Sequence, residues 1–205
     1  MRVIRESSED EMVATFLQAE IDSSRWGDRV RQLLARRELS EDIIRSPRLM
    51  SSLQNQQRAE LLGDFRGWKR KSMLFQDWPT ILNWSIVAIG KNDLDTIRYA
   101  SSAEWSELSR GTLEVRVGVN RVKGGDPSIP GRVPVPEIRE IEKVFRRGGS
   151  IPRLIGIAPS VGSMIVMVEG RARITGYFLS GAKQEIELIL GMAPVADVAG
   201  WKWFK

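Results

Sequence analysis

The chain has 205 residues with 42% hydrophobic content, which is enough to fold without cross-links, and its formal net charge is +5. Cysteine and histidine are both absent, which excludes disulfides, thiol nucleophiles, and the zinc and haem sites that depend on these side chains. No apolar run approaches a membrane span and residues 1–20 do not resemble a signal peptide, so we expect a cytoplasmic protein without a membrane partner.

The first half of the sequence is predicted to be mainly helical. Apolar residues at three- and four-residue spacing predict helices over 9–21, 25–37, 42–50 (broken at Pro47) and 54–65. Arginines line the second helix, and aromatic and basic residues alternate over 63–71. Such patterns can bind nucleic acid, but they are equally typical of a solvated helix face and of a surface loop with aromatic anchors.

The middle of the chain combines strand, helix and loop signals. Residues 84–89 predict a buried strand, 93–108 a helix, and the alternation over 113–119 a strand with one wet face. Glycine and proline then dominate 123–136, which predicts a lid or a linker with Lys123 and Arg132 as its candidate functional residues. We expect a helical region over 1–110 and a second domain over 111–205, which could pack as one unit.

The last third predicts a compact helix–strand–strand–helix unit. A helix opens at Pro134 and Pro136 and ends before Gly148-Gly149. Strands are expected over 151–157, 163–168 and 185–190, and helical spacing runs over 174–179. The aromatic residues of 201–204 are expected to pack on the sheet edge or the N-terminal helices, the alternative being a nucleobase stack.

The candidate site is the sequence Glu169-Gly170-Arg171-Ala172-Arg173, between the apolar strand and the helix. A strand that turns at once into a helix presents unpaired amides, which attract anions, and Gly170 permits close backbone approach. Arg171 and Arg173 can each offer a planar fork to phosphate, while Glu169 can accept a proton or bind Mg²⁺. The alternative is a structural ion pair between Glu169 and one of the arginines.

The order of these elements from about Pro134 to Gly191, with the Glu-Gly-Arg-Ala-Arg box, resembles the ParB/sulfiredoxin superfamily. It is similar to the N-terminal domain of ParB-like proteins and to free serine kinases of that fold. The resemblance implies that Gly170 and Arg173 bind phosphate, that Glu169 is the kinase-type acid, and that a nucleoside di- or triphosphate binds with Mg²⁺. Arg171 departs from the kinase and sulfiredoxin boxes, which excludes sulfiredoxin's chemistry, and no helix-turn-helix follows to read DNA.

Together these features predict an α/β (α+β) protein, with a helical N-terminal half and a ParB/sulfiredoxin-like small mixed sheet with helices in the C-terminal half. Its expected function is binding of a nucleotide or another phosphorylated small molecule, with phosphoryl transfer or nucleotide hydrolysis. The alternatives are a non-enzymatic nucleic-acid or protein-binding module, and a nuclease using the same site. The 31 basic and 26 acidic residues are interspersed, so charge alone does not separate these functions.

Overall fold

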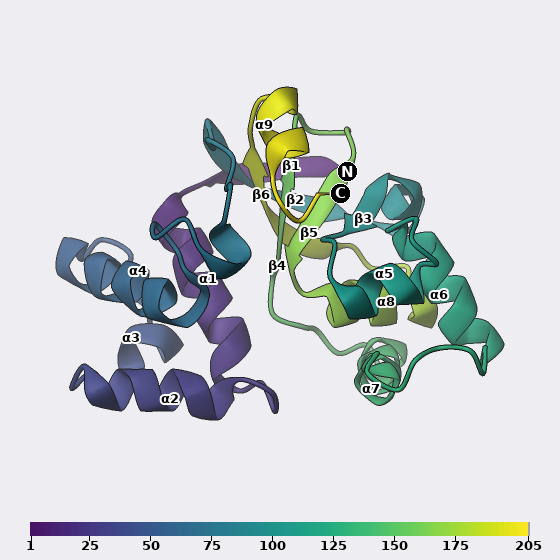
Figure 1. Cartoon of the computed structure of the whole chain (residues 1–205), viewed down its shortest axis with the longest axis horizontal. Helices are drawn as coiled ribbons and strands as arrows, with labels where there is room; N and C mark the ends of the chain where they lie inside the picture. Colours follow the sequence, from purple (N-terminus) through teal and green to yellow (C-terminus); the bar gives the residue numbers. More distant parts are fainter. Residues whose placement is uncertain (205) are drawn as a thin grey trace.

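The computed structural model describes residues 1–204, in which six strands form a single mixed sheet (Figure 1). The strand order is β1–β2–β6–β4–β5–β3; β4 is parallel to β6, β3 is parallel to β5, and the remaining neighbours are antiparallel. The predicted mixed α/β class is therefore confirmed, and the finer ParB-like arrangement stays a prediction. The strands are β1 (Arg2–Ser7), β2 (Asn83–Ile89), β3 (Ile97–Tyr99), β4 (Leu154–Ala158), β5 (Ile165–Glu169) and β6 (Ile186–Met192).

The sheet joins the two halves of the sequence. β2 and β6 pair along their whole length, from Asn83 opposite Met192 to Ile89 opposite Ile186. At the other side of the sheet, β3 pairs with β5. The regions 1–110 and 111–205 thus contribute strands to the same sheet, and the first region is less purely helical than its sequence predicts.

One face of the sheet packs against a group of helices that we call the helical lobe, residues 9–75 (Figure 1). Ser8 and Ser51 accept a hydrogen bond from the first turn of α1 and α4, respectively, as N-cap residues do. Apolar side chains of β4 and β5 meet those of α1 in one buried cluster. The elements of this lobe are α1 (Glu9–Ile21), α2 (Gly27–Arg36), α3 (Asp42–Arg45), α4 (Ser52–Arg66) and η1 (Met73–Phe75).

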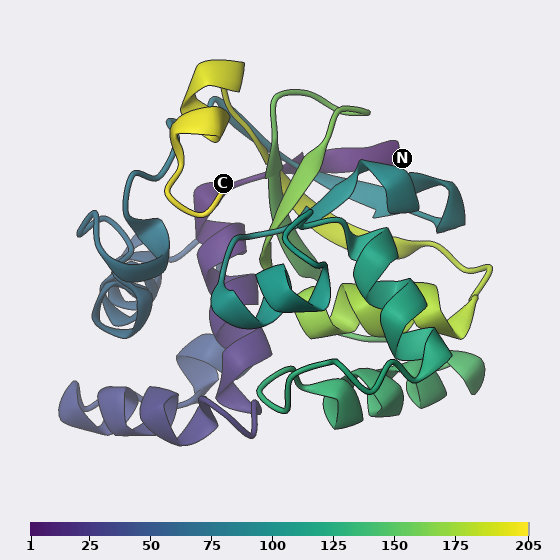
Figure 2. The ribbon, with the colours of Figure 1, turned by 45° about the vertical axis from the view of Figure 1, so that its right-hand side comes forward.

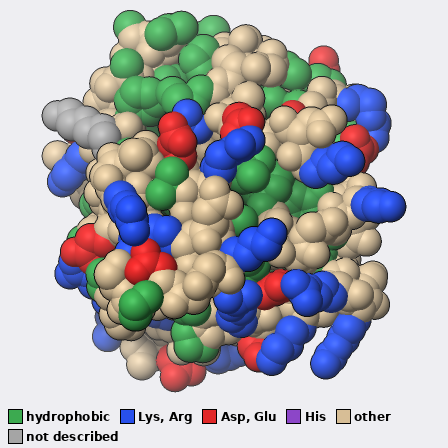
Figure 3. All heavy atoms as spheres, turned by 90° about the vertical axis from the view of Figure 1, so that its right-hand side faces the viewer, with side chains coloured by type: hydrophobic (Ala, Val, Ile, Leu, Met, Phe, Trp, Pro, Cys, Tyr) green, Lys and Arg blue, Asp and Glu red, His purple; other side chains and the backbone are tan. Residues whose placement is uncertain are grey.

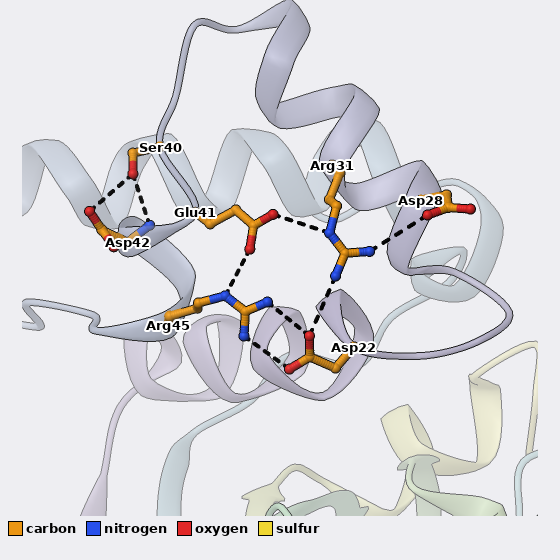
Figure 4. A network of polar contacts seen from close by, with 7 residues as sticks. All are labelled: Asp22, Asp28, Arg31, Ser40, Glu41, Asp42 and Arg45. Atoms are coloured by element: carbon orange, nitrogen blue, oxygen red, sulfur yellow. Dashed lines mark hydrogen bonds and ion pairs between the residues drawn. The ribbon is translucent and has the colours of Figure 1, made fainter.

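Exposed charges also connect the helices of this lobe. Arg31 and Arg45 both reach Asp22 and Glu41, so that the end of α1, the helix α2 and the start of α3 share one ion-pair network (Figure 4). Because these groups are solvated, each pair contributes at most about 1 kcal/mol. This part of the basic surface is therefore matched by carboxylates on the same helices.

The opposite face of the sheet is covered by α5 to α8, which lie together, with α5 next to the helical lobe (Figure 2). No helix within residues 1–204 has the length and apolar character needed to cross a membrane. The remaining elements are η2 (Lys91–Thr96), α5 (Ala103–Leu108), α6 (Val115–Gly124), α7 (Val135–Arg146), α8 (Arg171–Ser180) and α9 (Val195–Gly200).

The structure corrects three sequence predictions. Residues 113–119, predicted as a strand, begin the helix α6, and 93–108, predicted as one helix, contain η2, β3 and α5. In α6 the buried apolar side chains are Val115, Val119 and Val122, which share a helix face. The strand β1 has no counterpart in the prediction because most of its residues are exposed, so it lacks an apolar pattern.

The aromatic residues singled out in the sequence are packed. Phe65 and Trp68 are 6% and 4% exposed, which favours the loop with aromatic anchors over a base-stacking surface. Trp201 is fully buried, stands edge-on to Trp78 at 5.2 Å, and donates to the carbonyl oxygen of Leu74 at 3.3 Å. The prediction that the aromatic tail packs against the rest of the fold is thereby confirmed.

Candidate functional site

The predicted site lies where β5 ends and α8 begins. Glu169 is the last residue of β5, and Gly170 is the N-cap of α8 with φ +89°. This left-handed conformation favours glycine, and a Cβ at this position would also collide with the side chain of Leu154. The sharp turn brings the first turn of the helix directly against the end of the strand.

The N-terminus of α8 has free donors. Gly170 supplies no side-chain cap, and the first helical bond runs from the amide of Ile174 to the Gly170 carbonyl at 2.8 Å. The amides of Arg171, Ala172 and Arg173 have no acceptor within residues 1–204. Together with the helix dipole, these amides attract an anion.

Arg173 is fully engaged in the structure. Its guanidinium pairs with Glu169, and it donates to the carbonyl oxygens of Pro152 and Arg153 at 3.1 and 3.3 Å. Burial lowers the pKa of Arg173 to about 10, against the opposing charges of Glu20 and Glu137. These contacts connect α8 to the segment before β4. The pair between Arg173 and Glu169 is the structural ion pair that the sequence left open as the alternative.

Arg171 faces a different part of the molecule. Its guanidinium donates one hydrogen bond, of 3.3 Å, to the hydroxyl of Ser102, and it lies 5.7 Å from the ring centre of Trp105. No carboxylate of residues 1–204 forms an ion pair with it. Burial is the main cause that lowers the pKa of Arg171 to about 10, and the charge of Arg66 lowers it further, while Glu104 opposes both.

Two further arginines, from the helical lobe, surround this position. Arg66 pairs with Glu20 at 3.0 Å, and Arg25 pairs with Glu104 of α5 at 3.6 Å. We call Arg25, Arg66, Arg171 and Arg173 the arginine cluster. Three of its members have a carboxylate partner, and Arg171 is the one without any in the part of the chain that the structure describes.

The sequence prediction missed the partners of this cluster, which are Glu20, Arg25, Arg66, Ser102 and Glu104. They come from α1, α4, α5 and a connecting turn, so no local motif unites them. One signal was present. Glu20 follows the apolar stripe of the predicted helix 9–21, and it is 7% exposed in the structure. A carboxylate on a buried helix face usually has a basic partner.

The residues named for a lid lie elsewhere. Lys123 belongs to the last turn of α6, and Arg132 in the following loop donates to Glu107 of α5 at 2.8 Å. The same loop is fixed through Asp126, which accepts from Arg121 at 2.7 Å. Neither Lys123 nor Arg132 has a hydrogen bond or ion pair with residues 169–173 within the described chain, and a lid stays a prediction.

The surroundings of Glu169 do not fit a resident Mg²⁺. No group of three acidic side chains that could hold a metal occurs in residues 1–204, and the carboxylate of Glu169 is taken by Arg173. Mg²⁺ commonly enters nucleotide sites with the phosphates and keeps several of its waters. A bound magnesium ion here would therefore depend on the ligand.

Two hollows of the described surface are separate from the arginine cluster. Their volumes are about 600 and 560 Å³, and both are lined by Trp68 and Lys69 of the helical lobe. Their walls are mostly apolar and contain no member of the cluster. The hollows offer space, whereas the start of α8 offers an unpaired positive charge. For a phosphorylated ligand the charge is decisive, because phosphate binding requires hydrogen-bond donors.

No family model matches the chain, and neither a curated protein nor a solved structure matches it.

Proposed function

We propose that this protein binds a phosphorylated small molecule or nucleotide at the start of α8, through Arg171 and the free amides that follow Gly170. One observation carries the proposal: Arg171 is half-buried, charged and without an ion-pair partner among residues 1–204. A cation in such surroundings is costly unless an anion neutralises it. The guanidinium keeps several donors available for phosphate oxygens.

Gly170 and Arg173 have supporting roles in this proposal. Gly170 allows the left-handed turn that sets the first amides of α8 against the end of β5, and Arg173 fixes the position of α8 through its contacts before β4. Phosphoryl transfer or hydrolysis would need Glu169 to leave Arg173 before it could accept a proton. The geometry thus supports binding more directly than catalysis.

The rival function, a nucleic-acid-binding surface, would require basic residues gathered on one face. On the face over α5 to α8, acidic side chains stand among the basic ones and apolar patches interrupt them (Figure 3). Extended contact with a phosphate backbone favours a continuous basic stripe. The distribution of charge on this face therefore favours a small ligand.

The test is nucleotide binding by calorimetry and thermal shift, with AMP, ADP and ATP, with and without Mg²⁺. Saturation at a hundredfold excess over the dissociation constant should stabilise the fold by about 2.7 kcal/mol. Arg171→Gln should weaken binding at least tenfold, since a charge-assisted hydrogen bond is worth about 1.5–3 kcal/mol. The matched control is Arg29→Gln, which removes the same charge from an exposed position on α2.

Equal affinity of the parent and the Arg171→Gln variant would remove Arg171 from the site. A steep salt dependence of DNA binding, without saturable nucleotide binding, would favour the rival. If the protein also turns over nucleotide, Glu169→Gln should keep binding and lose turnover; unchanged turnover would exclude Glu169 as the base.

A further inference from the structure

The helical lobe contributes a second, incompletely satisfied guanidinium to this region. Arg66 is the last residue of α4, its side chain is 21% exposed, and its guanidinium lies 4.1 Å from the ring centre of Trp26. Its hydrogen bond to Glu20 uses a terminal nitrogen, while the buried Nε has no partner within residues 1–204. Arg66 is therefore held by stacking on Trp26 and by the ion pair with Glu20, and its second terminal nitrogen has no hydrogen bond within residues 1–204.

Arg66 and Arg171 come from opposite sides of the boundary between the helical lobe and the α5–α8 layer. The ion pair between Arg25 and Glu104 crosses this boundary at 3.6 Å. The ring of Trp26, the residue after Arg25, stacks against the Arg66 guanidinium. On the other side, Glu104 lies in α5 beside Ser102 and Trp105, the two contacts of Arg171. A single chain of contacts thus links the two guanidiniums, with Glu20 as the carboxylate of Arg66.

We infer that Arg66 and Arg171 bind the same anionic group from the two sides of this boundary, and that the group is a terminal, dianionic phosphoryl group. The inference rests on the proposed function and extends it. The positive charge of Arg66 acts on Arg171, and a phosphate monoester presents two charges and three terminal oxygens, enough for two guanidinium forks and the α8 amides. A phosphodiester carries one charge and fewer free oxygens, so it matches Arg171 alone.

The experiment compares methyl phosphate with dimethyl phosphate at pH 7.5, by titrations followed with ³¹P NMR. The parent should bind the monoester about tenfold tighter than the diester, a difference of about 1.4 kcal/mol. In Arg66→Gln the ratio should fall to near one, because the second guanidinium is gone, while Arg171→Gln should lose both ligands. Arg29→Gln should resemble the parent.

Glu20→Gln provides a test of opposite sign. Removing this carboxylate leaves the donors of Arg66 without a competitor, so the affinity for the monoester should rise. If Arg66→Gln does not fold, Arg66→Lys takes its place, and it should retain part of the preference because it keeps the charge without the planar fork.

The possible failures are distinguishable. The role of Arg66 is overturned if the monoester preference is unchanged in Arg66→Gln or Arg66→Lys, or if Glu20→Gln lowers the monoester affinity. In that case the proposed function still stands, provided that Arg171→Gln loses binding. A parent protein that binds neither ester nor any nucleotide overturns the proposed function and this inference with it.

Discussion

Arg171 and Arg173 are two positions apart at the start of α8, and they face different neighbours. Residues at this spacing point to opposite sides of a helix, so one fork turns toward α5 and the other toward the segment before β4. The sequence Glu-Gly-Arg-Ala-Arg correctly indicated an arginine partner for Glu169. Which arginine is paired and which is free depends on residues far away in the sequence, such as Ser102, and no local pattern reports that.

Replacing Arg173 by alanine should destabilise the protein by about 3 kcal/mol, because it leaves Glu169 with a mostly buried and uncompensated charge. Urea unfolding followed by circular dichroism measures the change. The double variant Arg173→Met with Glu169→Leu, which removes both charges, should recover much of the loss. A loss below about 0.5 kcal/mol in Arg173→Ala would show that the pair behaves as a surface pair.

Gly170→Ala should cost about 2–4 kcal/mol, since alanine is strained at φ +89° and its Cβ would meet Leu154. The control is Gly181→Ala at the other end of α8, where φ is +67° and no atom lies near the added Cβ. There the cost should be about 1 kcal/mol. Equal losses at the two positions would mean that the contact with Leu154 relaxes freely.

At the scale of helices and strands, the sequence was most informative where one hydrophobic periodicity extended through a whole segment. The predicted bounds of α1 agree with the structure, and the strand at β2 and the helix at α7 were also found. Alternation misled at α6, because Val115 and Val117 fit a strand as well as a helix start; the wider spacing to Val119 and Val122 decides. β1 could not be predicted from the sequence, because backbone hydrogen bonds to β2 form this strand. Such pairing leaves no hydrophobic periodicity in side chains that are exposed.

The loop between α6 and α7 should be protected at its start. Asp126 accepts from the hydroxyl of Ser128, from the side chain of Arg121 and from the amide of Ser128, and these bonds hold the pKa of Asp126 below its usual range. The carboxylate therefore stays charged, and this stabilising contribution persists, until the pH falls well below the unfolded value. Hydrogen exchange should show protection of Ser128 at pH 5, and Asp126→Ala should abolish it. Fast exchange of Ser128 in the parent would restore the mobile lid predicted from composition.

At the scale of the whole molecule, the two regions seen in the sequence are not separate in the sheet. β6 lies between β2 and β4, so a chain limited to residues 111–205 would lose the neighbour along one full edge of β6. It would also expose the apolar face that α1 covers. The apolar periodicity and the Gly/Pro signals of the last third predicted the order of its elements, and gave no indication of this shared sheet.

The fragment 111–205 should therefore fail to fold alone, giving a broad urea transition and a circular dichroism spectrum of a largely unfolded chain. Co-expression with the fragment 1–110 should restore a cooperative transition, since the β2–β6 pairing can form between two chains. A cooperative transition of 111–205 by itself would contradict this and would establish it as an autonomous domain.

The position of β6 also has a consequence for the order of events during synthesis. The helical lobe is complete once residue 75 has left the ribosome, and its helices can form from local contacts. β1 precedes the lobe in the chain and β2 follows soon after it, yet one edge of β2 has no partner until the strand that begins at Ile186 has been made. During that interval an apolar strand has an unpaired edge, which is a template for wrong pairing. A nascent chain of this protein would thus expose this unpaired edge until β6 has been made.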